Sequence, residues 1–391
     1  MKTKTWKINK LEKVCEILDN KRVPISQKDR ISGIYPYYGA SGIVDYIDKY
    51  IFDEELVLIG EDGAKWGAFE NSAFIANGKY WVNNHAHILK PNNEILISRF
   101  LVYFLNFSNL EKYITGATVK KLNQQKLRQI EVPIPLLKEQ ERIVGILDES
   151  FAKIDESIKI LEQDLLNLDE LMQSVLQKAF NPLKDDTKEN YQLPQGWEWK
   201  SLGEICEINP RNKINDEVNV SFVSMNKILD GYDNEFSYVI KKWKDVKNGF
   251  THFKQGDIGL AKITPCFENK KSVIFDSLEN DIGAGTTELH VIRVVDNVMS
   301  KFLLWFFKTD RFIQNGILNM TGATGHKRVP KNFIKNLQIP LPPLKEQEQI
   351  ASYLDELSLN IKALKENYKT QIKDYEELKK SLLKKAFEGR L

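Results

Sequence analysis

V-P-I-P-L-L-K-E-Q-E-R-I-V-G-I-L-D stands at residues 132–148, and I-P-L-P-P-L-K-E-Q-E-Q-I-A-S-Y-L-D stands at residues 339–355. The two stretches align without a gap at an offset of 207 residues, and L-Q-K-A-F at 176–180 is matched by L-K-K-A-F at 383–387. A repeat this long is one structural unit used twice. Each copy begins with a proline-pinned extended segment that leads into a long helical pattern, so the sequence predicts two similar halves.

Both repeated segments carry apolar residues at helical spacing. Steps of mostly three and four over several heptads predict coiled-coil packing. Because an internal repeat closes best around a two-fold axis, we expect the two helices to pair antiparallel within the chain. Two helices cannot bury all of this apolar surface, so we also expect a further helical partner. The seam positions are Ile143, Ile146, Leu147, Ile154, Ile158, Leu161, Leu165, Leu168, Met172, Val175 and Ala179, then Ile350, Leu354, Leu357, Ile361, Leu364, Tyr368, Ile372, Tyr375, Leu378 and Leu382.

The segments between the helices match at their ends and differ in the middle. Leu11 and Cys15 align with Leu202 and Cys206 at an offset of 191, and T-G-A-T occurs at 115–118 and again at 321–324. Short β-branched and aromatic runs broken by Gly, Asn and Asp predict short strands with tight turns. The sequence therefore predicts an α+β protein in tandem half-repeats, one scaffold with two different working surfaces. The expected parts are globular domains at 1–137 and 196–344, long helices at 138–180 and 345–391, and a polar linker at 181–195.

Composition narrows the class of protein. The chain has 391 residues, 42% apolar and 28% charged, and no apolar run approaches the ~20 residues that span a bilayer. Three cysteines without C-x-x-C spacing, and no signal peptide, suit a reducing cytoplasm and no membrane. The net charge of +2 is uneven, because residues 138–180 carry −5, residues 345–391 carry +1 and the remainder carries +6. Basic globular parts suit a polyanionic partner.

The patterns of several enzymes are missing from the sequence. It contains no N-P-P-Y-like tetrapeptide or glycine-rich cofactor loop of a methyltransferase, and no G-x-x-x-x-G-K-[ST] for ATP hydrolysis. Asp257 followed by Glu268-Asn269-Lys270 has the loose spacing of a metal-dependent nuclease, which keeps a stand-alone nuclease among the alternatives. His85 and His87 have no Cys or third His nearby, so we predict no metal site.

Taken together, these features resemble the specificity subunit of type I restriction–modification systems. The resemblance covers essentially the whole chain, and the ordered set of motifs carries it rather than any single one. Its residues are L-K-E-Q-E at 137–141 and 344–348, the paired T-G-A-T segments, residues 35–50, 56–67 and 81–89 in the first half, and residues 262–270 and 285–290 in the second.

The resemblance implies two target-recognition domains held apart by two antiparallel helices. Each domain would read one half of a split double-stranded DNA target, and the helix length would set the gap between half-sites. The helices would dock two methyltransferase subunits, and restriction/translocase subunits would join them. The chain itself would need no catalysis and no cofactor. Because the central segments of the two half-repeats differ, the DNA target is predicted to be asymmetric. The alternatives are the recognition subunit of a type II restriction–methylation enzyme and a coiled-coil adaptor.

Direct readout of DNA needs bidentate donors and acceptors on loops. We interpret the basic residues after each T-G-A-T as phosphate contacts, because glycine turns bring backbone N–H groups close to the DNA backbone. The candidates are Lys65, Trp66, Asn83, His85, Lys120 and Lys121 in the first half, and Lys262, Thr264, Glu268, Asn269, Lys270, Thr286, Thr287, His326, Lys327 and Arg328 in the second. The candidates for partner binding on the helices are Ile143, Leu147, Ile158, Leu165, Met172, Ile350, Leu354, Ile361 and Leu378.

Overall fold

The computed structural model describes residues 6–116, 118–181, 183, 192–323 and 325–391. These divide into two compact units, the first made of residues up to 161 with 370–391, and the second of residues 162–369. Each unit contains part of both long helices, and we describe the units separately. The N-terminal five residues, Ala117 and Thr324 of the T-G-A-T segments, and most of the predicted linker (182 and 184–191) lie outside the described residues.

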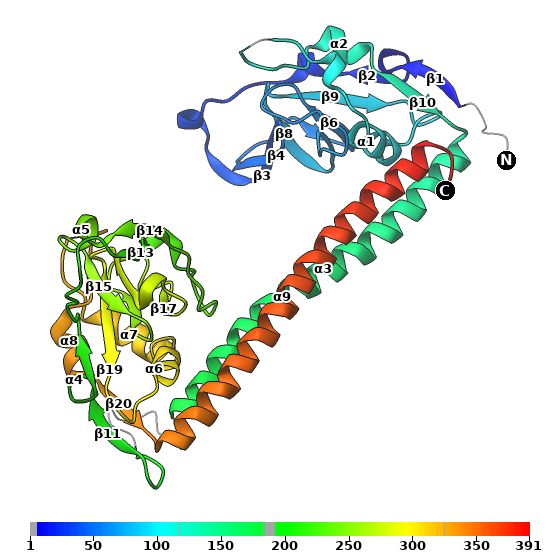
Figure 1. Ribbon diagram of the computed structural model, residues 1–391. Helices are drawn as coiled ribbons and strands as arrows, with labels where there is room; N and C mark the ends of the chain where they lie inside the picture. The colour runs from blue at the N-terminus through cyan, green and yellow to red at the C-terminus, as the bar shows by residue number, and fades with distance from the viewer. Residues whose placement is uncertain (1–5, 117, 182, 184–191, 324) are drawn as a thin grey trace. The chain divides into compact units, whose positions relative to one another are not determined.

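The first unit is a mixed α/β fold with strand orders β2-β9-β6-β7, β4-β3-β8-β5 and β1-β10 (Figure 1). All pairings are antiparallel except that of β3 with β8. Its elements are β1 (Lys7–Lys10), β2 (Cys15–Ile17), β3 (Ser32–Gly39), β4 (Gly42–Ile47), β5 (Phe52–Asp53), β6 (Leu56–Gly60), β7 (Ala73–Ala76), β8 (Lys79–Val82), β9 (Ala86–Pro91), α1 (Ser98–Phe107), α2 (Gln124–Arg128), β10 (Glu131–Ile134) and the start of α3 (Leu137–Phe180).

The second unit repeats this topology, with strand orders β12-β19-β16-β17, β14-β13-β18-β15 and β11-β20 and one parallel pair, β13 with β18. Cys15 and Cys206 occupy the equivalent strands β2 and β12, and both are buried. Its elements are β11 (Glu198–Ser201), α4 (Leu202–Ile205), β12 (Cys206–Ile208), β13 (Asn219–Val223), β14 (Val239–Lys242), α5 (Trp243–Val246), β15 (Thr251–Lys254), β16 (Ile258–Ala261), β17 (Ser272–Ile274), β18 (Ile282–Gly285), β19 (Leu289–Val294), α6 (Ser300–Phe306), α7 (Asp310–Leu318), α8 (Lys331–Asn336), β20 (Gln338–Leu341) and the start of α9 (Leu344–Phe387).

Strand β6 shows why the continuous apolar run L-V-L-I-G becomes a central strand. All five of its residues are buried, and successive side chains point to opposite faces. Val57 and Ile59 join the core that contains α1 and the long helices, whereas Leu56 and Leu58 join the core that contains Tyr80 of β8. A strand covered on both faces has no solvent side, so its sequence cannot alternate between apolar and polar residues.

The long helices α3 and α9 are 44 residues each and run antiparallel, as predicted. In the first unit the start of α3 packs in one core with the end of α9, and Lys379 forms an ion pair with Asp155. In the second unit the end of α3 packs with the start of α9, and Lys365 lies 2.5 Å from Asp169. No helix among the described residues is long and apolar enough to cross a membrane.

The glutamine of each L-K-E-Q-E motif anchors a long helix to its globular part. Gln140 is fully buried, accepts a hydrogen bond from the Ile97 amide (2.9 Å), and donates to the carbonyls of Ile95 (2.8 Å) and Pro135 (2.9 Å). Gln347 makes the same three bonds in the second unit. Its partners are the amide of Met299 (2.9 Å) and the carbonyls of Asn297 (3.2 Å) and Pro342 (2.9 Å). The repeat therefore preserves glutamine because only an amide supplies this set of donor and acceptor.

Candidate nucleic-acid interface

The loops that begin with T-G-A-T are closed by the same backbone bonds in both units. Thr115 and Lys121 exchange two N–H to C=O hydrogen bonds of 2.9 and 2.8 Å, and Thr321 and Arg328 exchange two of 3.0 and 2.8 Å. Gly116 has φ +95°, and a Cβ on it would lie 2.1 Å from the Val119 carbonyl oxygen. Glycine is therefore required there, because the close approach leaves no room for a side chain.

Each loop is also tied to the end of a central strand. The Leu122 amide donates to the Glu61 carbonyl just after β6, and the Val329 amide donates to the Lys262 carbonyl just after β16, both at 2.8 Å. We call this arrangement the loop frame, with residues 60–62, 115–116 and 118–122 in the first unit and 261–263, 321–323 and 325–329 in the second. It brings together residues that lie about 60 positions apart in the chain.

A buried histidine completes the loop frame in both units. The Nε2 atom of His87 in β9 lies 2.6 Å from the Leu122 carbonyl, and that of His290 in β19 lies 2.8 Å from the Val329 carbonyl. The other ring nitrogen differs, because Nδ1 of His87 lies 2.6 Å from Asp19, whereas Nδ1 of His290 has no hydrogen-bond partner among the residues that the structure describes. Burial lowers the pKa of His290 to about 4, so its neutral ring donates from Nε2.

In the first unit, buried charges surround the frame histidine. Asp19, Glu61 and His87 offer three ligand atoms within 4.8 Å of one another, a spacing that a metal ion could use. Both carboxylates are already paired, however, since Arg22 contacts both and Lys121 lies 2.8 Å from Glu61. Burial raises the pKa of Asp19, but the hydrogen bond and charge of His87, together with the hydrogen bonds from the Ile88 amide and Gln124, outweigh it and the net shift is downward. This donor set therefore fits an internal ion-pair network rather than a divalent cation.

In the second unit, the equivalent charges are arranged differently. Nε and Nη2 of Arg328 each donate to a carboxylate oxygen of Glu288 at 2.8 Å, and Nη1 donates to the His326 carbonyl at 3.0 Å. The Arg328 hydrogen bond is the largest cause of the lowered pKa of Glu288. Lys262 lies beside this pair, and burial lowers its pKa. Two cations accompany one acid here, so the second frame carries the more positive charge.

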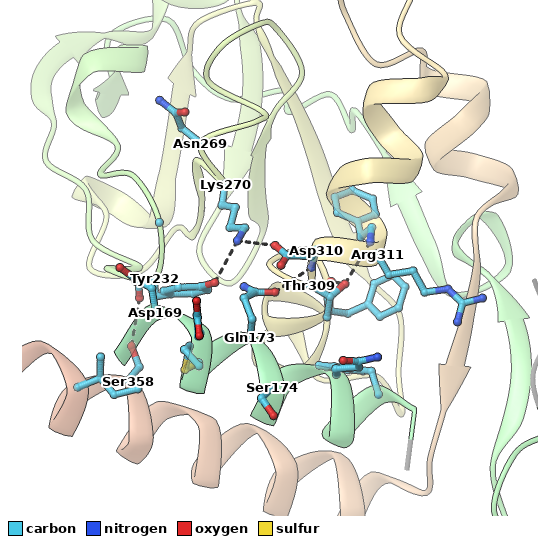
Figure 2. A pocket seen from close by; sticks show the side chains of 18 of the residues that line it. Asp169, Gln173, Ser174, Tyr232, Asn269, Lys270, Thr309, Asp310, Arg311 and Ser358 are labelled. Carbon is cyan, nitrogen blue, oxygen red and sulfur yellow. Dashed lines mark hydrogen bonds and ion pairs between the residues drawn. The ribbon is translucent and has the colours of Figure 1, made fainter. Parts of the chain in front are cut away.

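A cavity of about 1080 Å³ lies in the second unit where α3, α7 and α9 meet the loop between β16 and β17. Figure 2 shows Lys270 reaching into it, 2.8 Å from Asp310 and 3.0 Å from the Tyr232 hydroxyl. Ser358 of α9 donates to the Tyr232 carbonyl at 3.3 Å. The loop that carries Asn269 and Lys270 is therefore bonded to α7 directly, and to α9 through the turn at residues 230–235.

Lys308 lies fully buried beneath the same loop, in the turn between α6 and α7. Its Nζ atom donates to the carbonyls of Gly231 (2.5 Å), Lys270 (3.1 Å) and Ser272 (3.1 Å). Burial lowers the pKa of Lys308 to about 7, while the three carbonyl acceptors favour its charged form. Asn106 occupies the corresponding place in the first unit, where its side chain bonds both backbone groups of Ala73 in β7.

Comparison with known proteins shows the family to which this two-fold repeated architecture belongs. Residues 3–165 and 194–374 match the family described as the type I restriction modification DNA specificity domain. A putative type I restriction enzyme specificity subunit of Haemophilus influenzae is 31% identical over 369 residues, which cover 90% of this chain and 86% of that protein. This chain belongs to the type I specificity family.

Other members align over part of their length. The EcoAI and EcoEI specificity subunits of Escherichia coli are 45% and 42% identical, over 53% of this chain. The chain spans only 36% and 35% of those two relatives. Two solved structures share the fold. They are a chain of a type I R-M system (19% identity, TM-score 0.72, 99% of both chains) and the HsdS subunit of Thermoanaerobacter tengcongensis (18%, 0.60, 99% of this chain and 98% of that one).

In the first unit of this specificity-family chain, the loop frame contains Lys120 and Lys121 and contacts His85, all three of which were predicted to meet DNA. His85 lies 2.5 Å from Asp62, next to the ion pair of Lys121 with Glu61. Lys65 and Lys120 are exposed and form no ion pair within the described residues.

Two candidates of the first unit need correction. Trp66 is 6% exposed, packs in the core and donates from Nε1 to the Gly60 carbonyl (3.0 Å), so its ring cannot meet a base. Asn83 is also 6% exposed, and its Oδ1 accepts from the His85 amide (2.8 Å), so it positions that histidine instead of contacting DNA.

In the second unit, the predicted residues fall into two groups. One surrounds the loop frame, where the Thr264 amide donates to the Lys327 carbonyl (3.1 Å), Thr264 Oγ1 donates to Glu268 (3.1 Å), and Thr286 accepts from the Glu288 amide. Thr287, His326 and Lys327 are exposed there, and Lys262 and Arg328 are half-buried.

The other group faces the cavity, and the prediction that Lys270 contacts DNA is corrected there. Asn269 is exposed, but Lys270 is not available to DNA, because its amine is taken up by Asp310 and Tyr232. The nuclease-like spacing is not assembled either, since Asp257 is 1% exposed and forms a bidentate pair with Arg293 (2.9 and 2.7 Å).

The sequence reasoning missed Asp19, Arg22 and Glu61, which hold the first frame together. Glu61 and Asp62 directly follow the buried run of β6, and polar residues placed at the end of a central strand were a usable signal.

The positions predicted for partner binding on the helices also need correction. Ile143, Leu147, Met172, Leu354 and Ile361 are at most 5% exposed, because they pack into the cores of their own units. Ile158, Leu165 and Ile350 are half-buried, and only Leu378 is exposed. The large apolar residues of α3 and α9 that do reach the surface are Ile160, Leu166, Leu171, Leu344, Tyr353, Leu359, Leu364 and Leu378.

Proposed function

We propose that this chain is the DNA sequence-specificity subunit of a type I restriction–modification complex. The observation that carries the proposal is the loop frame, which occurs once in each unit with the same backbone bonds but different charged side chains. Equivalent frames that present unlike side chains suit two domains that read unlike half-sites. The target would be double-stranded, split by a nonspecific spacer and asymmetric.

The charge distribution supports DNA as the ligand. Outside the two long helical segments the chain carries a net charge of +6. Lys120 and Lys327 in the loop frames, and Lys65 in the turn after β6, are exposed and form no ion pair in the described part of the chain, as phosphate contacts require. Binding through such contacts weakens steeply as salt rises, because counterions are released from DNA.

The long helices suit a second role, which is to dock catalytic partners. The exposed apolar residues of α3 and α9 are the surface that we propose for two methyltransferase subunits, to which restriction/translocase subunits would be added. The chain would then recognise DNA in the cytoplasm without chemistry or a cofactor of its own, and the catalytic steps would belong to its partners.

The decisive experiment measures DNA binding by the full chain, alone and with its methyltransferase subunit. A duplex pool randomised over two half-sites is selected by binding, and the selected duplexes are titrated by fluorescence anisotropy at several salt concentrations. We expect weak, salt-dependent binding by the chain alone, and binding at least about 10³-fold tighter to one split motif with the partner present. Binding that stays non-selective with the partner, or shows no salt dependence, would contradict the proposal.

A variant pair tests the docking surface. Leu359 is 68% exposed on α9, and its neighbour Asn360 is also exposed. Combining Leu359→Glu with Leu364→Glu should weaken methyltransferase binding at least about tenfold, since a buried unpaired charge costs more than 1.4 kcal/mol. Asn360→Glu is the control and should leave the affinity unchanged. Equal affinity of both variants, measured by isothermal titration, would exclude this part of α9 from the interface.

A further inference from the structure

Arg328 is held more rigidly than any phosphate contact requires. Its backbone is paired with Thr321 on one side and Ile263 on the other. Its guanidinium is fixed by three bonds, two to Glu288 and one to the His326 carbonyl. The plane and direction of the group are therefore set before any ligand arrives, while its side chain stays 42% exposed.

The carboxylate beside Arg328 argues against a phosphate contact. Glu288 would repel a phosphate group that approached the same guanidinium, and it neutralises the charge on which such a contact depends. Lys327, the preceding residue in the chain, is exposed and forms no ion pair within the described residues, which is what a phosphate contact needs. Two adjacent basic residues therefore differ in the chemistry that they offer.

A fixed, exposed guanidinium beside an acid matches what base reading requires. Arginine reads guanine through two parallel N–H donors to O6 and N7, the commonest specific contact in the major groove. Three of the five N–H donors of a guanidinium are used by Glu288 and His326, so two remain for a ligand. Because the group is already oriented, it loses little conformational freedom when it binds.

We infer that Arg328 is a base-reading residue of the second unit and that its guanidinium, oriented by Glu288, donates to a guanine of the second half-site. This inference rests on the proposed function and names a residue that sets its specificity. It replaces the interpretation of Arg328 as a phosphate contact. Glu288 is the positioning residue, since it acts through Arg328.

The first unit places a lysine at the same position of its frame. Lys121 forms an ion pair with Glu61, and its Nζ atom lies 3.9 Å from Asp62. A single ammonium group between two acids therefore takes the place of the planar guanidinium of Arg328. A lysine amine lacks the planar pair of donors that matches guanine. The two half-sites should therefore differ at the base pair that meets this position.

The test uses the full chain in complex with its methyltransferase subunit. The preferred duplex is found by selection from the randomised pool, and each base pair of the second half-site is then replaced singly. Dissociation constants are measured by fluorescence anisotropy at several salt concentrations for the wild type, Arg328→Lys, Glu288→Gln and the control Lys327→Ala. Circular dichroism melting checks that each variant is folded.

We expect Arg328→Lys to lose about 5- to 150-fold of discrimination at one guanine-containing base pair, with an unchanged salt slope. Glu288→Gln should reduce the discrimination at the same base pair by a smaller factor and leave the discrimination at the other base pairs unchanged. If Arg328→Lys does not fold, Glu288→Gln serves as the test. Lys327→Ala should weaken all duplexes alike and reduce the salt slope by about one.

The inference is overturned if Arg328→Lys weakens every duplex equally and reduces the salt slope, because Arg328 is then a phosphate contact. It is equally overturned if neither the preference nor the slope changes, since Arg328 and Glu288 are then only a surface ion pair. A wild-type complex that shows no selective DNA binding would instead refute the proposed function, so the two failures are distinguishable.

Discussion

Replacing Gln140 by glutamate is the sharpest test of how the long helices are anchored. The change keeps the shape of the side chain and the oxygen that accepts from the Ile97 amide. It replaces the nitrogen that donates to the carbonyls of Ile95 and Pro135, at 2.8 and 2.9 Å, by a second oxygen. An ionised carboxylate would face two carbonyl oxygens in a fully buried site, so the folded protein must protonate it or lose the anchor.

The size of the effect follows from these contacts. A protonated glutamate has one O–H for two carbonyls, which leaves one buried acceptor unsatisfied at about 1–3 kcal/mol. Keeping the glutamate protonated at pH 7, above its ordinary pKa of about 4.3, costs a further ~3.5 kcal/mol, at about 1.36 kcal/mol for each pH unit above the pKa. We therefore expect Gln140→Glu to lower the free energy of unfolding by about 4.5–6.5 kcal/mol at pH 7, and by only about 1–3 kcal/mol near pH 4.

The sign of the pH dependence is specific to this anchor. The folded state raises the glutamate pKa above its unfolded value, so stability is retained below about pH 4.3 and lost as pH rises. Urea titrations at pH 5 and pH 7, followed by far-UV circular dichroism, should show the deficit of the variant growing by about 1.4 kcal/mol per pH unit. Gln347→Glu should behave alike in the second unit. Gln125→Glu, at an exposed position, should stay within about 0.5 kcal/mol of the wild type.

A deficit below about 1 kcal/mol at pH 7, or one that does not change with pH, would refute the reasoning. Either result would mean that Gln140 can turn away from the two carbonyls without loss, and that the repeated motif anchors the helix by some other contact.

Three further predictions concern the buried Lys308, helix α7 and the first T-G-A-T loop. Lys308→Met should abolish a rise in stability with pH, because the pKa of Lys308 lies near 7 when folded and near 10.5 when unfolded. The buried charge therefore lowers the free energy of unfolding of the wild type most below pH 7, and this loss shrinks as the pH approaches 10.5. Urea titrations at pH 7 and 9 measure how much the free energy of unfolding rises in the wild type and in the variant. Gly316→Ala should cost about 1–3 kcal/mol in thermal unfolding, since its Cβ would lie 2.2 Å from the Phe267 ring. Gly116→Ala should lower DNA affinity in anisotropy titrations at the first half-site alone, by distorting its loop; an equal loss at both half-sites would contradict this.

The doubled scaffold could be predicted because its signal is local and repeated. Glutamine in an otherwise charged helix start, and prolines just before it, recur at a fixed offset, and the structure gives each the same role. The antiparallel pairing followed from the same repeat. The helix starts are decided by residues that lie close together in the chain, whereas the pairing was inferred from the repetition of the whole unit.

The burial of individual side chains was less predictable, because it depends on which globular part covers which helix face. The seam positions Ile143 and Leu147 look like an interface for a partner, but each is covered by its own unit. Trp66 lies between glycines in an apparent surface turn, yet its ring fills the core beside α1. Spacing along a helix predicts that a face is apolar and does not say what covers it.

The pairing of charges at the loop frames was also beyond the sequence. Glu61 and Lys121 are 60 residues apart, and Glu288 and Arg328 are 40 apart, so no short motif joins them. A basic residue after a glycine turn was interpreted as a phosphate contact because its acidic partner could not be seen.

The twin glutamine anchors bear on how such a chain can change over generations. Within the described residues, the side chains of Gln140 and Gln347 bond to backbone groups of their own units, and none of those partners lies in a loop frame. Substitutions in the frames therefore leave the helix attachment untouched. Descendants of such a chain can change the bases that they recognise while the attachment of the long helices stays the same. After a duplication, one half can acquire a new recognition surface and keep the contacts that hold its helix.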